Sequence, residues 1–246
     1  HEARQMRDLD ILVRTSEARL ANELLLSMGY RSEREPPPLD RHLPELHLPA
    51  GIAAVELHIE ALAFPACYVL STDEVWRKAE PRNFAGASMR VLPPQWHLLQ
   101  GLLHHQLADH GHAWRLFGMK GLWEFAMCAH ELSPDGWRSL VEYAERHDIM
   151  EMLGSSAVQA NGLFGLSIPD VLVISNEARR HAEATLRRAR APLASRRALF
   201  VAQKLRFGFS PETLAHRYKP SDEEGLAKSA LRHLMFLARR YSGPRA

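Results

Sequence analysis

The stretch RDLDILV, Arg7 to Val13, has the pattern of a buried β-strand but carries two aspartates one residue apart. Aspartate is disfavoured in strands, and a buried carboxylate without a partner is costly. Because strand side chains alternate between two faces, Asp8, Asp10 and Leu12 share one face, and Leu9, Ile11 and Val13 share the other. Neighbouring carboxylates repel, and a shared divalent cation relieves the repulsion. The stretch therefore predicts a metal site, although D-x-D also occurs by chance on exposed edge strands.

A third acidic residue stands in AVELHIE (54–60), where Glu56 and His58 share one face of a second predicted strand. Glu56 is the candidate for the third metal ligand. His58 is a candidate to contact substrate or to hydrogen-bond a carboxylate, with plain packing beside the site as the alternative, and His42 is a weaker candidate. Carboxylate ligands suit Mg²⁺, with Mn²⁺ as the alternative, and two such ions about 3.5–4 Å apart can activate an attacking oxygen and stabilise a leaving one.

The order of predicted elements indicates an α+β protein. A helix follows Ser16 and stops at Gly29, strands are predicted at 42–48 and 53–62, a short helix at 71–79 and one more strand at 86–92. From Pro93 onward the apolar spacing is helical, and Ser221 with Glu224 predicts a capping box for the last helix. We therefore expect a small mixed-sheet domain at residues 1–92 and a helical domain at residues 93–246.

This combination resembles the DNA polymerase beta-like nucleotidyltransferase superfamily, and more closely an uncharacterised bacterial nucleotidyltransferase family. The similarity is carried by DLDILV (8–13), MGY (28–30), VELH (55–58) and the later segment LLQGLLHHQLADHGHAW (98–114). It covers about residues 4–170 and leaves the basic C-terminal region unmatched.

The resemblance implies an enzyme that moves a nucleoside monophosphate from an NTP such as ATP to an acceptor, with pyrophosphate leaving. By position, Asp8, Asp10 and Glu56 would be the metal ligands and catalytic residues, and Glu56 would also accept the proton of the attacking hydroxyl. Arg7 and His58 would contact the nucleotide, although Arg7 is equally readable as an ordinary surface charge. In such chemistry the protein mostly positions groups and neutralises charge.

The sequence departs from that family pattern in two places. The Gly/Ser- or Lys-Gly-bearing strand and helix that cradle the triphosphate should precede the D-x-D strand, but only seven residues precede Asp8. We expect that the sequence begins inside a longer protein, since His1 is no natural start. The alternative is a catalytically inactive nucleotide- or partner-binding module of the same fold. Second, relatives tend to carry Asp where Gly121 stands in GMKGLWEFA (118–126).

The fourteen histidines raise a further alternative, a His/Asp metal phosphohydrolase built on the helical half. The residues that suggest it are His104, His105, Asp109, His110, His112 and the pair His147-Asp148. His105 and Asp109 are four residues apart and would share a helix face, but no spacing matches a zinc motif such as H-E-x-x-H. Structural roles for these histidines are the favoured interpretation.

Composition and charge restrict the remaining function classes. With 46% hydrophobic and 24% charged residues and no apolar run of membrane-spanning length, the chain is expected to be an ordinary globular protein with no membrane partner. Cys67 and Cys128 lie far apart and fit packed thiols in a reducing cytoplasm. The segment from Asn176 onward contains sixteen Lys and Arg but six Asp and Glu, so it is strongly basic. A basic region is an alternative site for nucleic-acid binding, but no recognition motif favours it.

Overall fold

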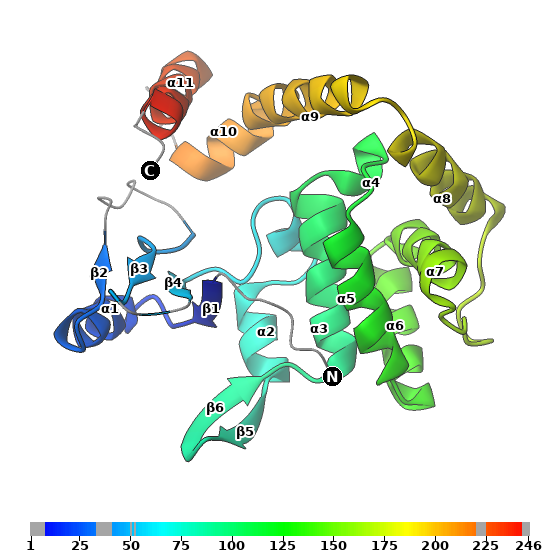
Figure 1. Ribbon diagram of the computed structural model, residues 1–246, viewed down its shortest axis with the longest axis horizontal. Helices are drawn as coiled ribbons and strands as arrows, with labels where there is room; N and C mark the ends of the chain where they lie inside the picture. The colour runs from blue at the N-terminus through cyan, green and yellow to red at the C-terminus, as the bar shows by residue number, and fades with distance from the viewer. Residues whose placement is uncertain (1–7, 33–40, 50, 52, 220–224, 243–246) are drawn as a thin grey trace. The chain divides into compact units, whose positions relative to one another are not determined.

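The computed structural model describes residues 8–32, 41–49, 51, 53–219 and 225–242 (Figure 1). The chain forms two compact units: His1–Ala61 with Arg206–Ala246, and Leu62–Leu205. A mixed sheet in the N-terminal region is followed by a helical region, which confirms the α+β prediction. The domain boundary placed between residues 92 and 93 stays a prediction.

The sheet of the first unit has the strand order β1-β4-β3-β2. Strand β1 (Asp8–Leu12) pairs in parallel with β4 (Ala54–His58), and the short strands β3 (Leu46–His47) and β2 (Arg31–Ser32) continue the sheet in antiparallel fashion. Helix α1 (Ala18–Ser27) connects β1 to β2 and ends before Gly29, whose φ of +93° is the left-handed conformation expected of a glycine stop.

The prediction that β1 is a buried strand is wrong. Four of its five residues are exposed, and the apolar residues Leu9 and Ile11 are 45% and 37% exposed. The reason is its position, because β1 is at the edge of the four-stranded sheet and has only β4 as a neighbour. The central strand β4, in contrast, has buried Val55 and Leu57, as its apolar face predicts.

The other predicted elements of this unit are found with shifted ends. Helix α1 begins after Glu17 rather than at Ser16, and its apolar residues Leu20, Leu24 and Met28 are exposed. The strands predicted at 42–48 and 53–62 are shorter, with His42 making an isolated antiparallel bridge to His58. At its C-terminal end the chain continues with α10 (Pro211–Tyr218) and α11 (Leu226–Ser242), and the capping box predicted at Ser221 and Glu224 lies outside the described residues.

The second unit is mostly helical. In chain order its elements are η1 (Ala66–Tyr68), α2 (Thr72–Lys78), β5 (Glu80–Phe84), β6 (Ala87–Val91), α3 (Pro94–Leu103), the π-helical turn η2 (His104–Ala108), α4 (Gly111–Trp114), α5 (Met119–His130), α6 (Pro134–Arg146), α7 (Met150–Phe164), α8 (Asn176–Ala189) and α9 (Leu193–Gly208), which ends past the unit boundary. Helices α3, α5, α6 and α7 pack around one apolar core.

The apolar stripes read from the sequence form this core. The four leucines predicted on one side of the helix after Pro93 are all buried, and so is the predicted stripe of α6: Leu98, Leu99, Leu102, Leu103, Trp137, Leu140, Val141 and Ala144. The predicted cap is also found, because the Ser133 hydroxyl accepts a 3.1 Å hydrogen bond from the Gly136 amide. Within the described residues no helix is long and apolar enough to cross a membrane.

Strand β6 confirms the strand predicted at 86–92, but its partner β5 was missed. The sequence of β5, EPRNF, contains residues that strands disfavour, including a proline. The pairing is instead carried by the tight turn at Ala85 and Gly86, both of which have positive φ. All ten residues of this hairpin are exposed.

Tyr143 ties α6 to the segment before α2. Its hydroxyl donates a 2.6 Å hydrogen bond to the Val69 carbonyl and lies 3.4 Å from the Glu74 carboxylate, which also completes the capping box with Ser71. Burial, reinforced by the negative charge of Glu74, raises the pKa of Tyr143 to about 12. The ring of Tyr143 is almost fully buried, so this hydrogen bond lies inside the core.

Replacing Tyr143 by Phe tests this contact. The Val69 carbonyl would lose its donor inside the core, so the free energy of unfolding should fall by about 1–3 kcal/mol in urea denaturation. Tyr68→Phe is the matched control, because Tyr68 is 73% exposed, and it should leave the unfolding midpoint unchanged. Equal midpoints for Tyr143→Phe and the wild type would contradict the assigned hydrogen bond.

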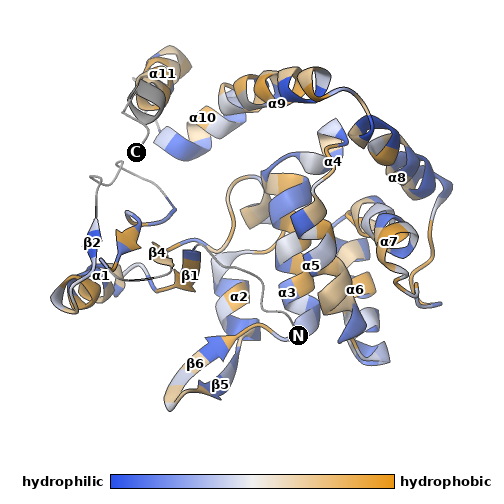
Figure 2. Ribbon diagram, viewed as in Figure 1, coloured by the Kyte–Doolittle hydropathy of each residue, from blue (hydrophilic) through white to orange (hydrophobic). Residues whose placement is uncertain are grey.

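Helix α8 is mostly hydrophilic, as its blue colour in Figure 2 shows, and packs through a narrow side that includes His181. The His181 ring stacks on His112 of α4 with centroids 3.9 Å apart and planes within 13°, and His181 Nε2 lies 2.8 Å from the His112 carbonyl oxygen. Burial, together with the neighbouring His181 and Arg115, lowers the pKa of His112 to about 4.

This stack predicts a pH dependence of stability. Unfolding restores the His112 pKa to about 6.5, so between pH 4 and 6.5 the unfolded chain binds more protons than the folded one. The free energy of unfolding should therefore fall as the pH drops through this range, with a His112 contribution of at most about 1.4 kcal/mol per pH unit.

Urea denaturation at pH 4.5, 5.5 and 6.5 measures that slope. His112→Gln should reduce it relative to the wild type, whereas His130→Gln, at an exposed position at the end of α5, should not. Identical slopes for His112→Gln and the wild type would refute the assignment.

Candidate metal centre

The pairing of β1 with β4 decides which side chains meet. The parallel register places Asp8 opposite Ala54, Asp10 opposite Glu56 and Leu12 opposite His58. Paired residues of neighbouring strands point to the same face, so Asp10 and Glu56 lie side by side and His58 follows two residues later. An aspartate and a glutamate on adjacent strands repel each other unless a positive charge lies between them.

His58 lies against both carboxylates. Its Nε2 atom is 3.3 Å from Asp10 Oδ1 and 3.3 Å from Glu56 Oε2. The three ligand atoms lie within 4.8 Å of one another, which is close enough for one cation to contact all three. The sequence predicted the shared face of Glu56 and His58, and the register adds Asp10 to it.

Exposure of these side chains increases in one direction across the cluster. The side chain of His58 is 10% exposed, that of Glu56 23% and that of Asp10 67%. His58 therefore forms the floor of the site and Asp10 its open edge. A ligand bound at Asp10 could reach solvent or a substrate without any movement of β4.

The donor atoms fit a divalent cation. His58 Nε2 is buried and makes no hydrogen bond among the described residues, although two carboxylate oxygens lie 3.3 Å away. A buried polar atom without a hydrogen bond costs roughly 1–3 kcal/mol, and a cation bound between these three atoms would satisfy it. Carboxylates suit Mg²⁺ and Mn²⁺, and imidazole suits first-row transition ions, so the donor set is compatible with a divalent cation.

His42 stands behind this cluster. Its bridge to His58 brings the two rings to 5.2 Å between centroids, and His42 Nδ1 lies 4.0 Å from Glu56 Oε2 and 3.0 Å from the Leu43 carbonyl oxygen. The sequence named His42, in the strand before β4, only as a weaker candidate, and the bridge to His58 brings it beside the cluster. His42 is placed to orient Glu56.

Asp8 and Arg7 remain the open members of the predicted set. Asp8 is exposed, occupies the same face of β1 as Asp10 and is paired with Ala54, one pleat away from the cluster that Asp10, Glu56 and His58 form. Its role as a ligand stays a prediction. Arg7 lies outside the described residues.

A second group of potential ligands lies in the helical unit. His104, His105 and Asp109 have ligand atoms within 4.8 Å of one another in and after η2. The i to i+5 bond from the Asp109 amide to the His104 carbonyl shows why, since the π-helical turn moves Asp109 near both histidines. Their ion-pair distances are 3.9–4.0 Å, longer than in the first cluster. The other histidines of the predicted set are not in this group: His110, His112 and His147.

Gly121, which stands where an Asp was expected, packs against the imidazole ring of His105. A Cβ atom built at Gly121 would clash with the imidazole ring of His105, so the ring fills the space that a side chain would need. His105 Nε2 in turn lies 3.8 Å from Glu124 Oε2 on α5. Gly121 and the position of His105 therefore depend on each other.

The fold and the site define a class: an α+β protein with a carboxylate-histidine cluster on the paired strands of a small mixed sheet. A family model described as an uncharacterised nucleotidyltransferase matches residues 1–165. The chain therefore belongs to this family of uncharacterised nucleotidyltransferases, and the recognition made from DLDILV and VELH is confirmed. No curated protein and no solved structure shows significant similarity to the chain.

Mn²⁺ titration tests the metal centre directly. Asp10→Asn and Glu56→Gln should each weaken binding of one Mn²⁺ ion by at least about tenfold, because even partners that only orient metal ligands cost 10–100-fold when removed. The free Mn²⁺ signal in electron paramagnetic resonance measures this. Asp8→Asn decides whether Asp8 is also a ligand.

Glu45→Gln is the control for the titration, since Glu45 lies in the same unit and contacts His47 rather than the cluster. It should bind Mn²⁺ as the wild type does. Unchanged Mn²⁺ affinity in both Asp10→Asn and Glu56→Gln would contradict the centre.

Proposed function

We propose that this chain is a divalent-metal-dependent nucleotidyltransferase that transfers a nucleoside monophosphate from an NTP to an acceptor hydroxyl. The observation that carries the proposal is the cluster of Asp10, Glu56 and His58 on adjacent strands, in a chain that belongs to a nucleotidyltransferase family. The exposed edge at Asp10 leaves room for phosphate oxygens to complete the coordination of a bound cation.

In the proposed reaction the acceptor oxygen attacks the α-phosphorus of the NTP. The bond from that phosphorus to the bridging oxygen breaks, and pyrophosphate leaves with the electron pair. The proton of the acceptor hydroxyl passes to a carboxylate, for which Glu56 is our candidate because it is less exposed than Asp10. The bound cation would neutralise charge on the phosphate oxygens and favour ionisation of the attacking hydroxyl.

The residues of the chain have separate parts in this proposal. Asp10, Glu56 and His58 hold the cation, with Asp8 as the candidate for a second ion. His58 contributes its ligand atom from the buried side, and His42 orients Glu56. Base preference and acceptor are set by contacts outside this cluster.

A second candidate, a His/Asp metal phosphohydrolase, is favoured by one observation, the grouping of His104, His105 and Asp109. Its ligand atoms could bind an ion that activates water. The first candidate is preferred because the matched family is one of nucleotidyltransferases and because the contacts within the sheet cluster are shorter.

An assay with NTPs labelled at the α-phosphate tests the proposal. The purified chain is incubated with each NTP, with Mn²⁺ or Mg²⁺, and with a small-molecule extract and candidate proteins as acceptors. We expect metal-dependent transfer of label and release of pyrophosphate, and a loss of at least about a hundredfold in Asp10→Asn/Glu56→Gln, because the reaction depends on the held cation.

Two further variants sharpen the result. Glu45→Gln should retain transfer, and so should His105→Ala/Asp109→Ala if the sheet cluster is the active site. Transfer that persists in Asp10→Asn/Glu56→Gln and disappears in His105→Ala/Asp109→Ala would overturn the assignment. NTP binding without any transfer by the wild type would favour the inactive module.

A further inference from the structure

A cavity in the helical unit has a different chemistry from the metal centre. Its volume is about 760 Å³, within the range of small-molecule sites. Its two walls lie far apart in sequence. One comes from residues 105–118, around η2 and α4, and the other from residues 188–201, at the end of α8 and the first half of α9. We call it the arginine pocket after four of its lining residues: Arg115, Arg188, Arg196 and Arg197.

The positive charge of this pocket is not balanced locally. Asp109 is the one carboxylate that lines it, against four guanidinium groups. Among the residues that the structure describes, Arg115, Arg196 and Arg197 have no carboxylate within ion-pair distance, in contrast to Arg180 and Arg187 on the outer side of α8, which pair with glutamates. Uncompensated guanidinium groups in a concave site attract anions, and their planar donor sets match phosphate oxygens.

A hydrogen bond to the backbone holds Arg188 in place, and the backbone of Arg115 has an uncommon conformation. Nη1 of Arg188 donates a 2.9 Å hydrogen bond to the Trp114 carbonyl, which ties α8 to the end of α4. Arg115, the next residue, has a φ of +49°, a left-handed conformation that is uncommon outside glycine and clusters at binding sites. The end of α4 therefore does two things at one end of the pocket: the Trp114 carbonyl anchors Arg188, and the next residue is Arg115.

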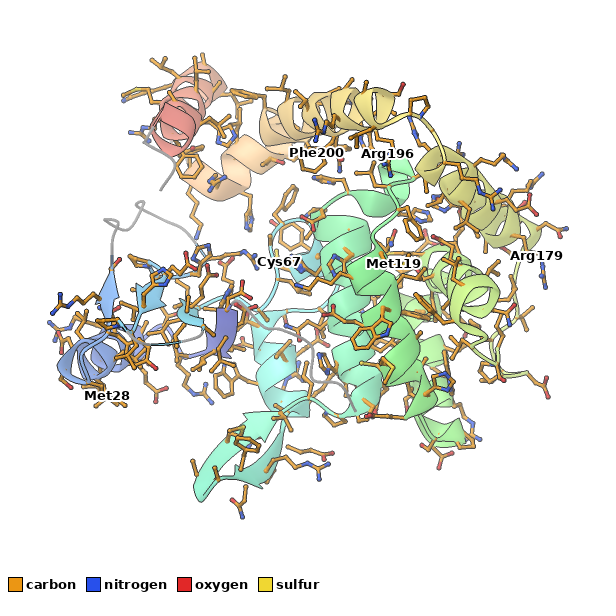
Figure 3. All side chains as sticks on the ribbon, viewed as in Figure 1. Met28, Cys67, Met119, Arg179, Arg196 and Phe200 are labelled. Carbon is orange, nitrogen blue, oxygen red and sulfur yellow. The ribbon has the colours of Figure 1, made fainter. Side chains whose placement is uncertain are left out.

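Helix α9 supplies the opposite wall. Arg196 and Phe200, both labelled in Figure 3, are four residues apart and thus share one face of α9, and both line the pocket. Phe117 lines it from the other wall. The lining therefore combines guanidinium groups with aromatic rings, and a planar group of a ligand can stack on such a ring.

We propose that the arginine pocket binds a phosphorylated ligand of mononucleotide size, with its phosphates on the arginines and its planar ring against the aromatic side chains. In this proposal Asp109 accepts hydrogen bonds from amino or hydroxyl groups of the ligand, because a carboxylate would repel the phosphates. The size of this half-open pocket and the presence of a carboxylate favour a small molecule over the backbone of a nucleic acid. The proposal is independent of nucleotidyl transfer, since it requires none of the sheet residues.

Calorimetric titration tests the pocket with the metal centre disabled. The full chain carries Asp10→Asn/Glu56→Gln, the buffer contains EDTA, and the probes are ADP, GDP, CDP and UDP, each alone. We expect at least one to bind, and Arg115→Gln/Arg196→Gln to weaken it by at least about tenfold, because each charge-assisted contact to phosphate contributes roughly 1.5–3 kcal/mol. Circular dichroism verifies that the variants fold.

The matched control is Arg179→Gln/Arg180→Gln, which removes two exposed arginines of α8 that do not line the pocket. It should leave the affinity unchanged. Phe200→Ala should weaken binding of the nucleoside diphosphate but not of inorganic pyrophosphate. This comparison separates the contribution of ring stacking to the affinity from that of the arginine charges.

Three results would overturn the proposal. The first is that none of the four probes binds at concentrations up to 1 mM. The second is equal loss of affinity in Arg115→Gln/Arg196→Gln and the control. The third is arginine-dependent binding of a twelve-nucleotide single-stranded RNA when the mononucleotides do not bind, which would make this a nucleic-acid surface.

Discussion

The parallel pairing of β1 with β4 is the constraint on which the candidate active site depends. Its register sets Asp10 beside Glu56 and His58 beyond them, so one backbone ladder brings two negative charges and a buried imidazole together. A shift of one residue would turn one partner to the opposite face and separate them. In the proposed metal site, a bound cation would relieve both the repulsion between the carboxylates and the missing hydrogen bond of His58 Nε2.

The exposure of β1 follows from the same arrangement. An edge strand is paired on one side. Here its partner is β4, the strand that brings Glu56 and His58 beside Asp10. The central strand β4 is held by buried Val55 and Leu57, so it provides a rigid support for Glu56 and His58, while Asp10 stays accessible at the edge. A binding site needs both properties: fixed ligands on the inner side and an open path for substrate on the outer side.

Period-two alternation was sufficient to predict which side chains share a face within a strand, and helical spacing was sufficient for the core stripes of α3 and α6. Information that depends on pairing was only partly available from the residues alone. An exposed edge strand was open as an alternative for β1, but the hairpin partner β5 is a pairing that overrides local preference. The grouping of His104 with Asp109 requires a π-helical turn, which no residue pattern in this segment signals.

The central claim is that one divalent cation binds Asp10, Glu56 and His58 together. Anomalous diffraction from crystals soaked in Mn²⁺ tests it most directly, because the map locates the ion without reference to activity. The account predicts a peak about 2.0–2.3 Å from one oxygen of each carboxylate and from His58 Nε2, within the usual range of such bonds. A peak only at His104, His105 and Asp109, or none near β1 and β4, would contradict it.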